Sequence, residues 1–82
     1  MVRVIFTEKF KQILDKIKDA TLKNKIIKQI EKIKENPKLG KPTMYARKGT
    51  RELYVKPFRL SYNYMDDEDM VYILDLYHKK RQ

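Results

Sequence analysis

Two consecutive amphipathic segments occupy the first 36 residues, and together they limit the folds open to this chain. Apolar side chains at helical spacing predict a helix over residues 8–18; they are Phe6, Phe10, Ile13, Leu14 and Ile17. A second helix begins at Asp19 or Thr21 and ends at Asn36-Pro37, because the residue before a proline is driven out of helical geometry. Two such helices cannot bury both apolar stripes alone, so they need a sheet to pack against.

The rest of the chain supplies that sheet. Val2–Phe6 is typical of a short strand, and further strand candidates lie at residues 43–46, 51–56, 58–65 and 70–78. We expect a loop at residues 40–42, a turn at 48–50 and an acidic hairpin turn at 66–69. The last strand is nearly all apolar, as expected of a central strand covered on both faces. The predicted fold class is α+β: an N-terminal strand, a two-helix hairpin, then three to four antiparallel strands forming a twisted sheet.

Composition excludes several kinds of site. The chain has no cysteine and one histidine, which rules out disulfides and cysteine-ligated metals and makes another structural metal site unlikely on chemical grounds. We therefore expect no metal and no cofactor. No apolar run approaches the roughly 20 residues needed to span a bilayer, and the apolar stretch at the N-terminus is too short for a secretion signal. We expect a soluble, cytoplasmic protein that does not bind membranes.

The formal net charge is +9, which favours a polyanionic partner: nucleic acid, an acidic protein or an anionic membrane face. Residues 1–42 hold twelve Lys/Arg against five Asp/Glu, and residues 43–82 hold eight against six. Four of those six acids lie together at residues 66–69, so the rest of the second half is also strongly basic. For the lysines on the two helices we favour a solvated polar face over a primary RNA-binding role.

Arg59 is the first candidate for a functional residue. A strand that turns Phe58, Leu60 and Tyr62 to the core must send Arg59 to the opposite face. It is either an ordinary exposed arginine or part of an anion site, since Arg51, Lys56 and the tail Lys79-Lys80-Arg81 could converge on the same surface.

The residues at the end of the last strand form a second candidate group. The basic run Lys79-Lys80-Arg81 is either a frayed, solubilising C-terminus or a functional cluster. Cationic neighbours would favour the neutral form of His78, which could then act as a general acid or base. Tyr77 could pack in the sheet, stack on a base or transfer a proton.

The glycine turn carries Arg47 and Lys48, which are either solvated or a phosphate clamp. No catalytic triad, paired-carboxylate site or phosphate-binding glycine loop is visible in the sequence. The chemistry that the residues still allow is phosphoryl transfer assisted by cationic side chains. It suits metal-free RNA cleavage, in which the RNA supplies the 2′-OH nucleophile and the protein supplies charge stabilisation and proton transfer.

These residues also carry a family likeness. The run GTRELYVKPFRLSY at residues 49–62, the acidic turn, and VYILDLYHKK at residues 71–80 resemble the RelE/ParE toxin superfamily, most of all its RelE-like and HigB-like branches. The order of elements fits over nearly the whole chain, while the specific motifs occupy residues 49–80. The resemblance implies that residues 1–82 form a single RelE-like toxin domain.

The resemblance further implies ribosome-dependent cleavage of mRNA and a cognate antitoxin, with which the chain would form a toxin–antitoxin hetero-oligomer. Arg59 matches the arginine that stabilises the scissile phosphate, and Lys80, or Lys79 beside it, matches the basic residue after the last strand. His78 and Tyr77 sit where relatives have a proton donor or a stacking ring. The implied catalytic residues are therefore Arg59, His78 and Lys80. The implied RNA-binding residues are Arg47, Lys48, Arg51, Lys56, Tyr77, Lys79 and Arg81.

The chain departs from the family pattern at two places. Tyr54 stands where relatives have an arginine, and the tyrosine that some relatives place beyond the basic motif is absent. Two other functions therefore stay open: a ParE-like inhibitor of DNA gyrase on the same fold, and a catalytically inactive RNA-binding member.

Overall fold

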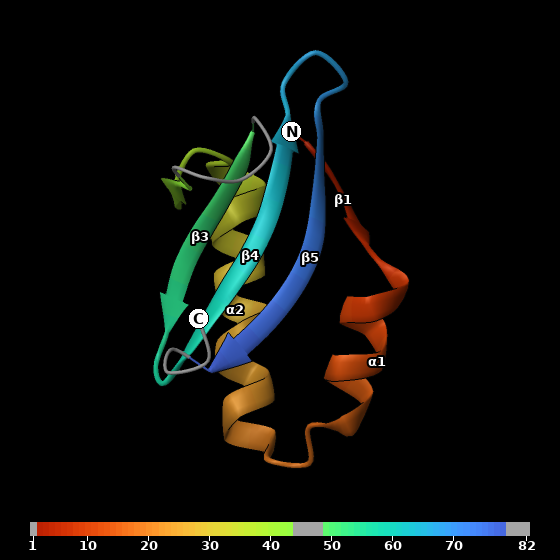
Figure 1. Cartoon of the computed structure of the whole chain (residues 1–82), viewed down its shortest axis with the longest axis vertical. Coiled ribbons are helices and arrows are strands. Elements are labelled where there is room, and N and C mark those ends of the chain that lie inside the picture. Colours follow the sequence, from red (N-terminus) through yellow and green to blue (C-terminus); the bar gives the residue numbers. More distant parts are fainter. Residues whose placement is uncertain (1, 44–48, 79–82) are drawn as a thin grey trace.

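Two helices and a five-stranded sheet make up the described part of the chain (Figure 1). The computed structural model describes residues 2–43 and 49–78. The elements in chain order are β1 (Arg3–Phe6), α1 (Glu8–Lys16), α2 (Ala20–Glu35), β2 (Lys41–Pro42), β3 (Thr50–Val55), β4 (Phe58–Met65) and β5 (Met70–His78). The α+β class and the order of strand, helix pair and strands are confirmed.

Both helices begin at a capping side chain. Thr7 accepts a hydrogen bond from the backbone N–H of Phe10 at 3.3 Å, and Asp19 accepts one from Thr21 at 2.9 Å. These bonds satisfy backbone donors that have no partner within the first turn. The second helix ends before Asn36-Pro37, as predicted, and the first ends at Lys16, two residues earlier than expected.

The strand order is β1-β5-β4-β3-β2. Strands β2 to β5 pair antiparallel, as predicted, but β1 pairs parallel with β5, so the sheet is mixed. The loop predicted at residues 40–42 is wrong, because Lys41 and Pro42 form β2 and pair with Glu52 and Arg51. Of the strand candidate at residues 43–46, Thr43 lies outside β2 and residues 44–46 lie outside the described residues.

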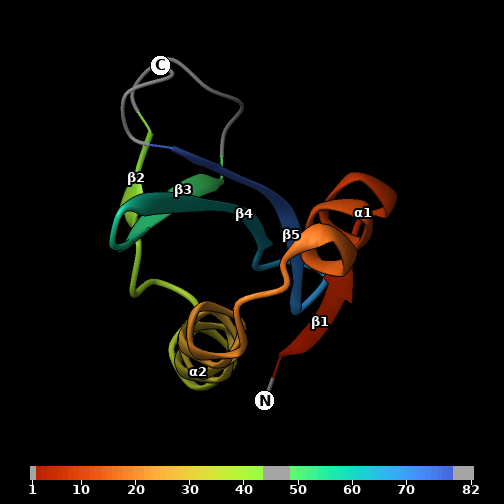
Figure 2. The same cartoon turned by 90° about the horizontal axis from the view of Figure 1, so that it is seen from below.

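The core lies between α2 and one face of the sheet. Figure 2 shows α2 beneath this face and α1 beside β5, at the edge of the sheet. Helix α2 buries Ile26, Ile30 and Ile33, and α1 buries Phe10. The sheet contributes the buried side chains Val55, Leu60, Tyr62, Val71, Ile73 and Leu76. In the described part of the chain no helix lies over the other face of the sheet, which we call the open face.

Within residues 2–43 and 49–78, the apolar last strand is therefore covered by a helix on one face only, contrary to the sequence-based prediction. Val71, Ile73 and Leu76 are buried, while the other residues of β5 are half-buried. The buried positions change phase because β5 has an irregularity: Ser61 pairs with Asp75, but Tyr62 pairs with Ile73. Leu74 is the extra residue of this bulge, and such bulges redirect the side chains beside them.

Candidate functional site

Arg59 lies on the open face, between two tyrosines. In the register of the sheet Arg59 of β4 is opposite Tyr54 of β3 on one side and Tyr77 of β5 on the other. Residues directly opposite each other in a sheet project from the same face, so these three side chains form one row. Tyr54 is 52% exposed and Tyr77 is half-buried. The row thus offers a cation flanked by two aromatic rings that can stack on bases.

A carboxylate is paired with this arginine. Nη1 of Arg59 lies 3.3 Å from Oε1 of Glu52, and both side chains are partly buried. The Nε of Arg59 is buried and has no hydrogen-bond partner among the described residues. A partly exposed ion pair is worth only about 0–1 kcal/mol, so an incoming anion can compete with Glu52 for the guanidinium. The arrangement provides a cation and a proton acceptor within hydrogen-bonding reach of each other.

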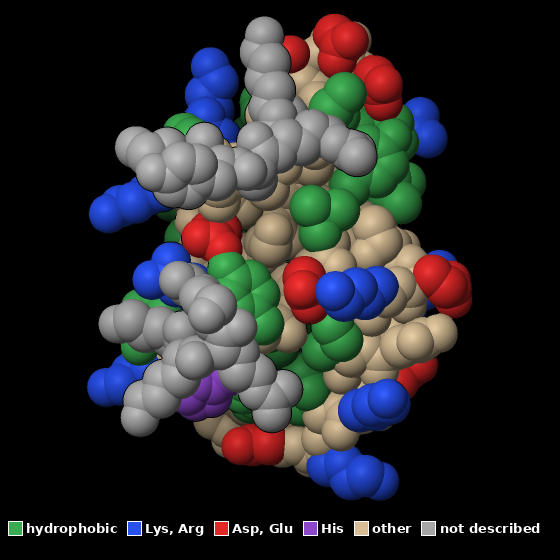
Figure 3. Space-filling model, in the orientation of Figure 1, with side chains coloured by type: hydrophobic (Ala, Val, Ile, Leu, Met, Phe, Trp, Pro, Cys, Tyr) green, Lys and Arg blue, Asp and Glu red, His purple; other side chains and the backbone are tan. Residues whose placement is uncertain are grey.

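The open face is mixed in charge rather than uniformly basic. Figure 3, which looks onto this face, shows acidic, basic and apolar side chains interspersed on it. The row next to Arg59 runs from Glu52 through Ser61 to Asp75, and Asp75 forms an ion pair with Lys9 of α1 at 3.1 Å. Each carboxylate in this row therefore has a cationic partner.

The same face has a cavity of about 280 Å³ at the other end of β4, close to the acidic turn. Its lining residues are Asn63, Met65, Glu68, Tyr72 and Leu74. The hydroxyl of Tyr72 donates a hydrogen bond to Glu68, and this bond raises the pKa of Tyr72 above 10.0. Because the turn beside the cavity carries four exposed acids, this end of the face disfavours a phosphate.

The predicted residues at the end of β5 divide between the two faces. Tyr77 lies beside Arg59, as described above, whereas His78 is opposite Phe58 in the register. The rings of His78 and Phe58 make an edge-to-face contact with centroids 5.6 Å apart. Because successive residues of a strand point to opposite faces, the structure does not bring His78 beside Arg59. Lys56 is exposed in the turn between β3 and β4, at the end of the sheet where β5 finishes (Figure 1).

Arg51 lies on the helix side of the sheet, not with Arg59. It is opposite Tyr62, and its Nη1 donates hydrogen bonds to the carbonyl oxygens of Lys38 at 3.2 Å and Gly40 at 2.6 Å. The Tyr62 hydroxyl donates to the carbonyl of Pro37 at 2.8 Å and accepts from the N–H of Gly40 at 2.7 Å. Burial raises the pKa of this tyrosine above 10.0. The predicted RNA-binding residue Arg51 therefore anchors the segment between α2 and β2.

Five predicted site residues lie outside the described part of the chain. They are Arg47, Lys48, Lys79, Lys80 and Arg81. Their proposed roles stay predictions. Within residues 2–43 and 49–78, no group of three or more potential ligands is placed to hold a metal ion, and neither helix is long and apolar enough to cross a bilayer.

Sequence reasoning missed Glu52 and Lys9. The pairing of Glu52 with Arg59 was within reach, because a tight turn at Lys56-Pro57 sets Tyr54 opposite Arg59 and turns Glu52 to the same face. The contribution of Lys9 could not be predicted from the sequence, because it depends on how α1 packs beside β5 and on the bulge at Leu74.

Comparisons with known proteins agree on the family. A family model described as "ParE toxin of type II toxin-antitoxin system, parDE" matches residues 4–82. The search of curated proteins finds no match. Among solved structures, the toxin-antitoxin complex RelBE2 from Mycobacterium tuberculosis contains a chain that is 26% identical, with a TM-score of 0.76 over 95% of this chain and 98% of the other.

Two more distant structures share the fold. The intact E. coli RelBE toxin-antitoxin complex matches at 16% identity with a TM-score of 0.83, over 99% of this chain and 100% of the other. The archaeal RelE-RelB complex from Pyrococcus horikoshii matches at 11% identity with a TM-score of 0.79, over 99% and 98%. The chain belongs to the family of ParE toxins of type II toxin–antitoxin systems, within the RelE/ParE toxin superfamily, and is a toxin.

Proposed function

We propose that this toxin is an endoribonuclease that cleaves mRNA on the ribosome without a metal ion. The observation that carries the proposal is the position of Arg59 on the open face, between Tyr54 and Tyr77 and 3.3 Å from the Glu52 carboxylate. Aromatic rings can stack on bases, and a guanidinium can bind a phosphate through two parallel hydrogen bonds. The site therefore suits a single-stranded RNA with one phosphodiester held at Arg59.

The reaction follows from the chemistry of RNA. The 2′-OH attacks the adjacent phosphorus, its proton passes to a base, and the bond from phosphorus to the 5′ oxygen breaks, leaving a 2′,3′-cyclic phosphate. Glu52 is our candidate for the base, and Arg59 stabilises the charge that develops on the phosphate oxygens. For the acid that protonates the departing 5′ oxygen, the family resemblance offers His78 and Lys80. Of these we propose Lys80, because His78 lies against Phe58 on the other face of the sheet.

The proposal includes a cognate antitoxin and a cytoplasmic location, where the ribosomes are. Two solved structures that match this chain are described as toxin-antitoxin complexes, and a third as a RelE-RelB complex. A net charge of +9 on 82 residues would bind nucleic acid indiscriminately unless a partner masked it. We therefore expect an acidic antitoxin and a toxin–antitoxin hetero-oligomer.

A second candidate function is inhibition of DNA gyrase, the alternative that the resemblance to ParE leaves open; the matching family model is named for ParE toxins. A gyrase inhibitor has no need of a base beside Arg59 or of a 2′-OH on its target. The two functions therefore differ in what they require from the nucleic acid.

A substrate in which a single ribose lacks its 2′-OH distinguishes cleavage of mRNA from inhibition of gyrase. The purified toxin is added to ribosomes programmed with an mRNA that carries either a ribose or a 2′-deoxyribose at the cleavage position, and in parallel to a supercoiling assay with gyrase. We expect cleavage of the ribose substrate with a cyclic phosphate end, no cleavage of the deoxy substrate, and normal supercoiling. Inhibited supercoiling with intact mRNA would establish the second candidate instead.

A further inference from the structure

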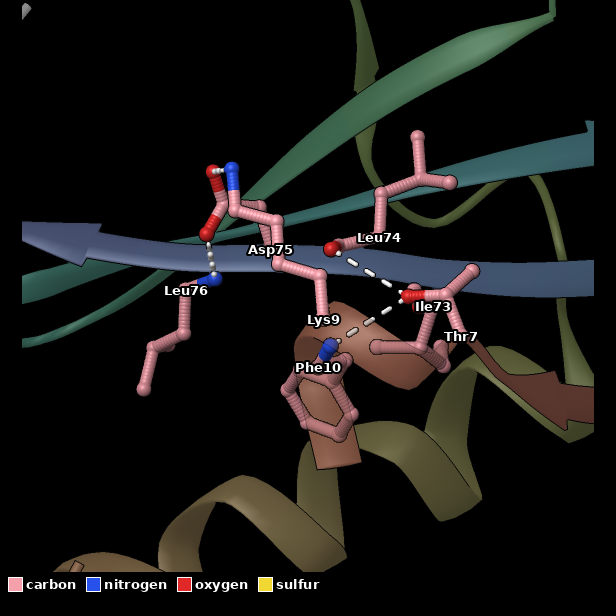
Figure 4. A network of polar contacts seen from close by, with 7 residues as sticks. All are labelled: Thr7, Lys9, Phe10, Ile73, Leu74, Asp75 and Leu76. Carbon is pink, nitrogen blue, oxygen red and sulfur yellow. Dashed lines mark hydrogen bonds and ion pairs between the residues drawn. The ribbon is translucent and has the colours of Figure 1, made fainter. Parts of the chain in front are cut away.

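Lys9 reaches the open face from outside the sheet. It lies in the first turn of α1, and its Nζ is 3.1 Å from Oδ2 of Asp75 in β5 (Figure 4). The side chain of Lys9 is 69% exposed, whereas that of Asp75 is only 27% exposed. An ammonium group has three donors and Asp75 uses one, so two remain available to a ligand.

Hydrogen bonds between the start of α1 and β5, and within β5, restrict the position of Lys9. Thr7 caps α1 and donates a hydrogen bond to the carbonyl of Ile73 at 2.7 Å, which ties the start of the helix to the bulge in β5. Oδ1 of Asp75 accepts a hydrogen bond from the N–H of Leu76 at 2.8 Å (Figure 4). Since both the helix start and the carboxylate are held by β5, the ammonium group of Lys9 is held over the open face as well.

Lys9 and Arg59 pair with the two carboxylates at the ends of one row of the sheet. Glu52, which pairs with Arg59, is opposite Ser61, and Ser61 is opposite Asp75, which pairs with Lys9. With neighbouring strands about 4.8 Å apart, the two carboxylate-bearing residues are separated by roughly 10 Å. An extended single strand that crosses the strands of the sheet along this row would therefore pass both Arg59 and Lys9.

We propose that Lys9 is a second phosphate contact of the toxin, binding the RNA backbone next to the phosphodiester held at Arg59. This inference rests on the proposed function. Lys9 is a binding residue, since it lies across the sheet from the reacting phosphate, and Asp75 positions it. Asp75 also opposes the RNA through its own negative charge, so it limits how tightly the face binds a polyanion.

The alternative is that the ion pair merely fastens α1 to β5. The two explanations predict different relations between the variants Lys9→Ala and Asp75→Asn. If the pair only fastens α1 to β5, both variants lose the same contact, and neither changes the affinity for RNA. If Lys9 binds phosphate, Lys9→Ala weakens RNA binding, while Asp75→Asn strengthens it because a negative charge near the backbone is removed.

The test measures binding of a 2′-deoxy-substituted, uncleavable single-stranded RNA to the full chain over a range of salt concentrations. Losing one phosphate contact lowers the slope of log affinity against log salt by about 0.7 for a single strand. We expect that decrease for Lys9→Ala, near-wild-type binding for Lys9→Arg, and several-fold tighter binding for Asp75→Asn. The matched control is Lys11→Ala, an exposed lysine on the same helix, which should leave the slope unchanged.

Arg59→Ala separates failure of this inference from failure of the proposed function. If Arg59→Ala lowers the slope and Lys9→Ala does not, RNA binds the open face but Lys9 is not a contact, and the inference is overturned. If neither variant changes the slope, RNA does not bind this face and the proposed site is wrong as well. A thermal unfolding curve for each variant shows whether it is folded. If Lys9→Ala is unfolded, the direction of the change in RNA affinity of Asp75→Asn still decides between the two explanations.

Discussion

Arg59 has hydrogen-bonding capacity to spare. A guanidinium carries five N–H donors in a rigid fork, and Glu52 takes one of them at 3.3 Å. The buried Nε has no partner among the described residues, and a buried donor without a partner costs about 1–3 kcal/mol. Because the side chain is 33% exposed while its Nε is buried, an incoming phosphate would have to bind the exposed Nη groups.

Replacing Arg59 with alanine should therefore damage catalysis far more than folding. Loss of one donor to a developing oxyanion commonly costs about 2.7–4 kcal/mol, or roughly 100- to 1,000-fold in rate. Single-turnover cleavage on the ribosome should fall by that factor in Arg59→Ala, while the urea midpoint changes little. Arg59→Lys should restore only part of the rate, because an ammonium cannot form the bidentate contact. A wild-type rate in Arg59→Ala would show that this residue does not meet the scissile phosphate.

Glu52→Gln distinguishes a base from a mere partner of Arg59. The substitution keeps the shape of the side chain but removes the charge and the proton acceptor. If Glu52 is the base, cleavage should fall roughly 10²- to 10⁴-fold while RNA binds more tightly, because the guanidinium is no longer neutralised. Both quantities are measured on the same variant, by single-turnover kinetics and by anisotropy. A variant that bound more tightly and also cleaved faster would mean that Glu52 only restrains Arg59.

At the scale of elements, the connection from α2 to β2 depends on two side chains of the sheet. Arg51 and Tyr62 together hold the carbonyl oxygens of Pro37, Lys38 and Gly40 and the N–H of Gly40. A Cβ at Gly40 would lie 2.8 Å from the hydroxyl of Tyr62, so the backbone needs a glycine to approach this closely. The network fixes the end of α2 against β3 and β4, and hence the helix that forms the core.

Stability should consequently respond to the Tyr62 hydroxyl and to high pH. Tyr62→Phe leaves the Gly40 N–H buried without its acceptor and should cost about 1–3 kcal/mol in urea unfolding. Burial raises the pKa of this hydroxyl above 10.0, so the folded state favours its protonated form. The resulting stability is fully present below pH 10.0 and is lost as the pH rises through the folded-state pKa.

The pH dependence is checked by comparing wild type with Tyr62→Phe between pH 8 and 11. The difference in unfolding free energy should shrink above about pH 10, because only the wild type loses the contribution of this group. Tyr64→Phe, at a half-buried tyrosine of the same strand, serves as the control. A difference that stays constant across the range would contradict the assignment.

At the scale of the whole molecule, the cations are arranged differently on the helices and on the open face. The helices carry most of the lysines, while the open face carries cations that are each matched to a carboxylate in the described structure. Long-range attraction to a polyanion depends on the total charge, whereas the orientation of the bound strand depends on the cations held in place. The paired acids keep the open face from binding every polyanion equally.

Expression of the toxin alone should therefore arrest growth, and co-expression of its antitoxin should relieve the arrest. Total RNA from arrested cells should contain mRNA fragments with cyclic phosphate ends. Expression of Arg59→Ala at an equal level provides the matched control and should be tolerated. Harmless expression of the wild type would contradict a toxin of either kind, and arrest by Arg59→Ala with intact mRNA would favour gyrase as the target.

Patterns within short stretches of sequence were sufficient to predict most of the secondary structure and the face of the sheet on which Arg59 lies. Helix periodicity, the Asn36-Pro37 stop and the alternation of residues 58–65 act over a few residues, so they can be read without knowing the partners of each segment. The placement of Arg59 opposite to the Leu60 face follows from the same alternation. The motifs at residues 49–80 were sufficient for the superfamily.

Tertiary structure decided which predicted residues share a face. Sequence reasoning grouped Arg51 and His78 with Arg59, but Arg51 contacts the segment before β2 and His78 contacts Phe58. The parallel pairing of β1 with β5 and the approach of Lys9 to Asp75 join residues more than sixty positions apart in the chain. Such contacts depend on how the helices pack against a sheet that is itself assembled from distant segments. The sequence by itself therefore determined the elements and the central arginine, whereas packing decided the approach of Lys9 to Asp75 and the separation of Arg51 and His78 from Arg59.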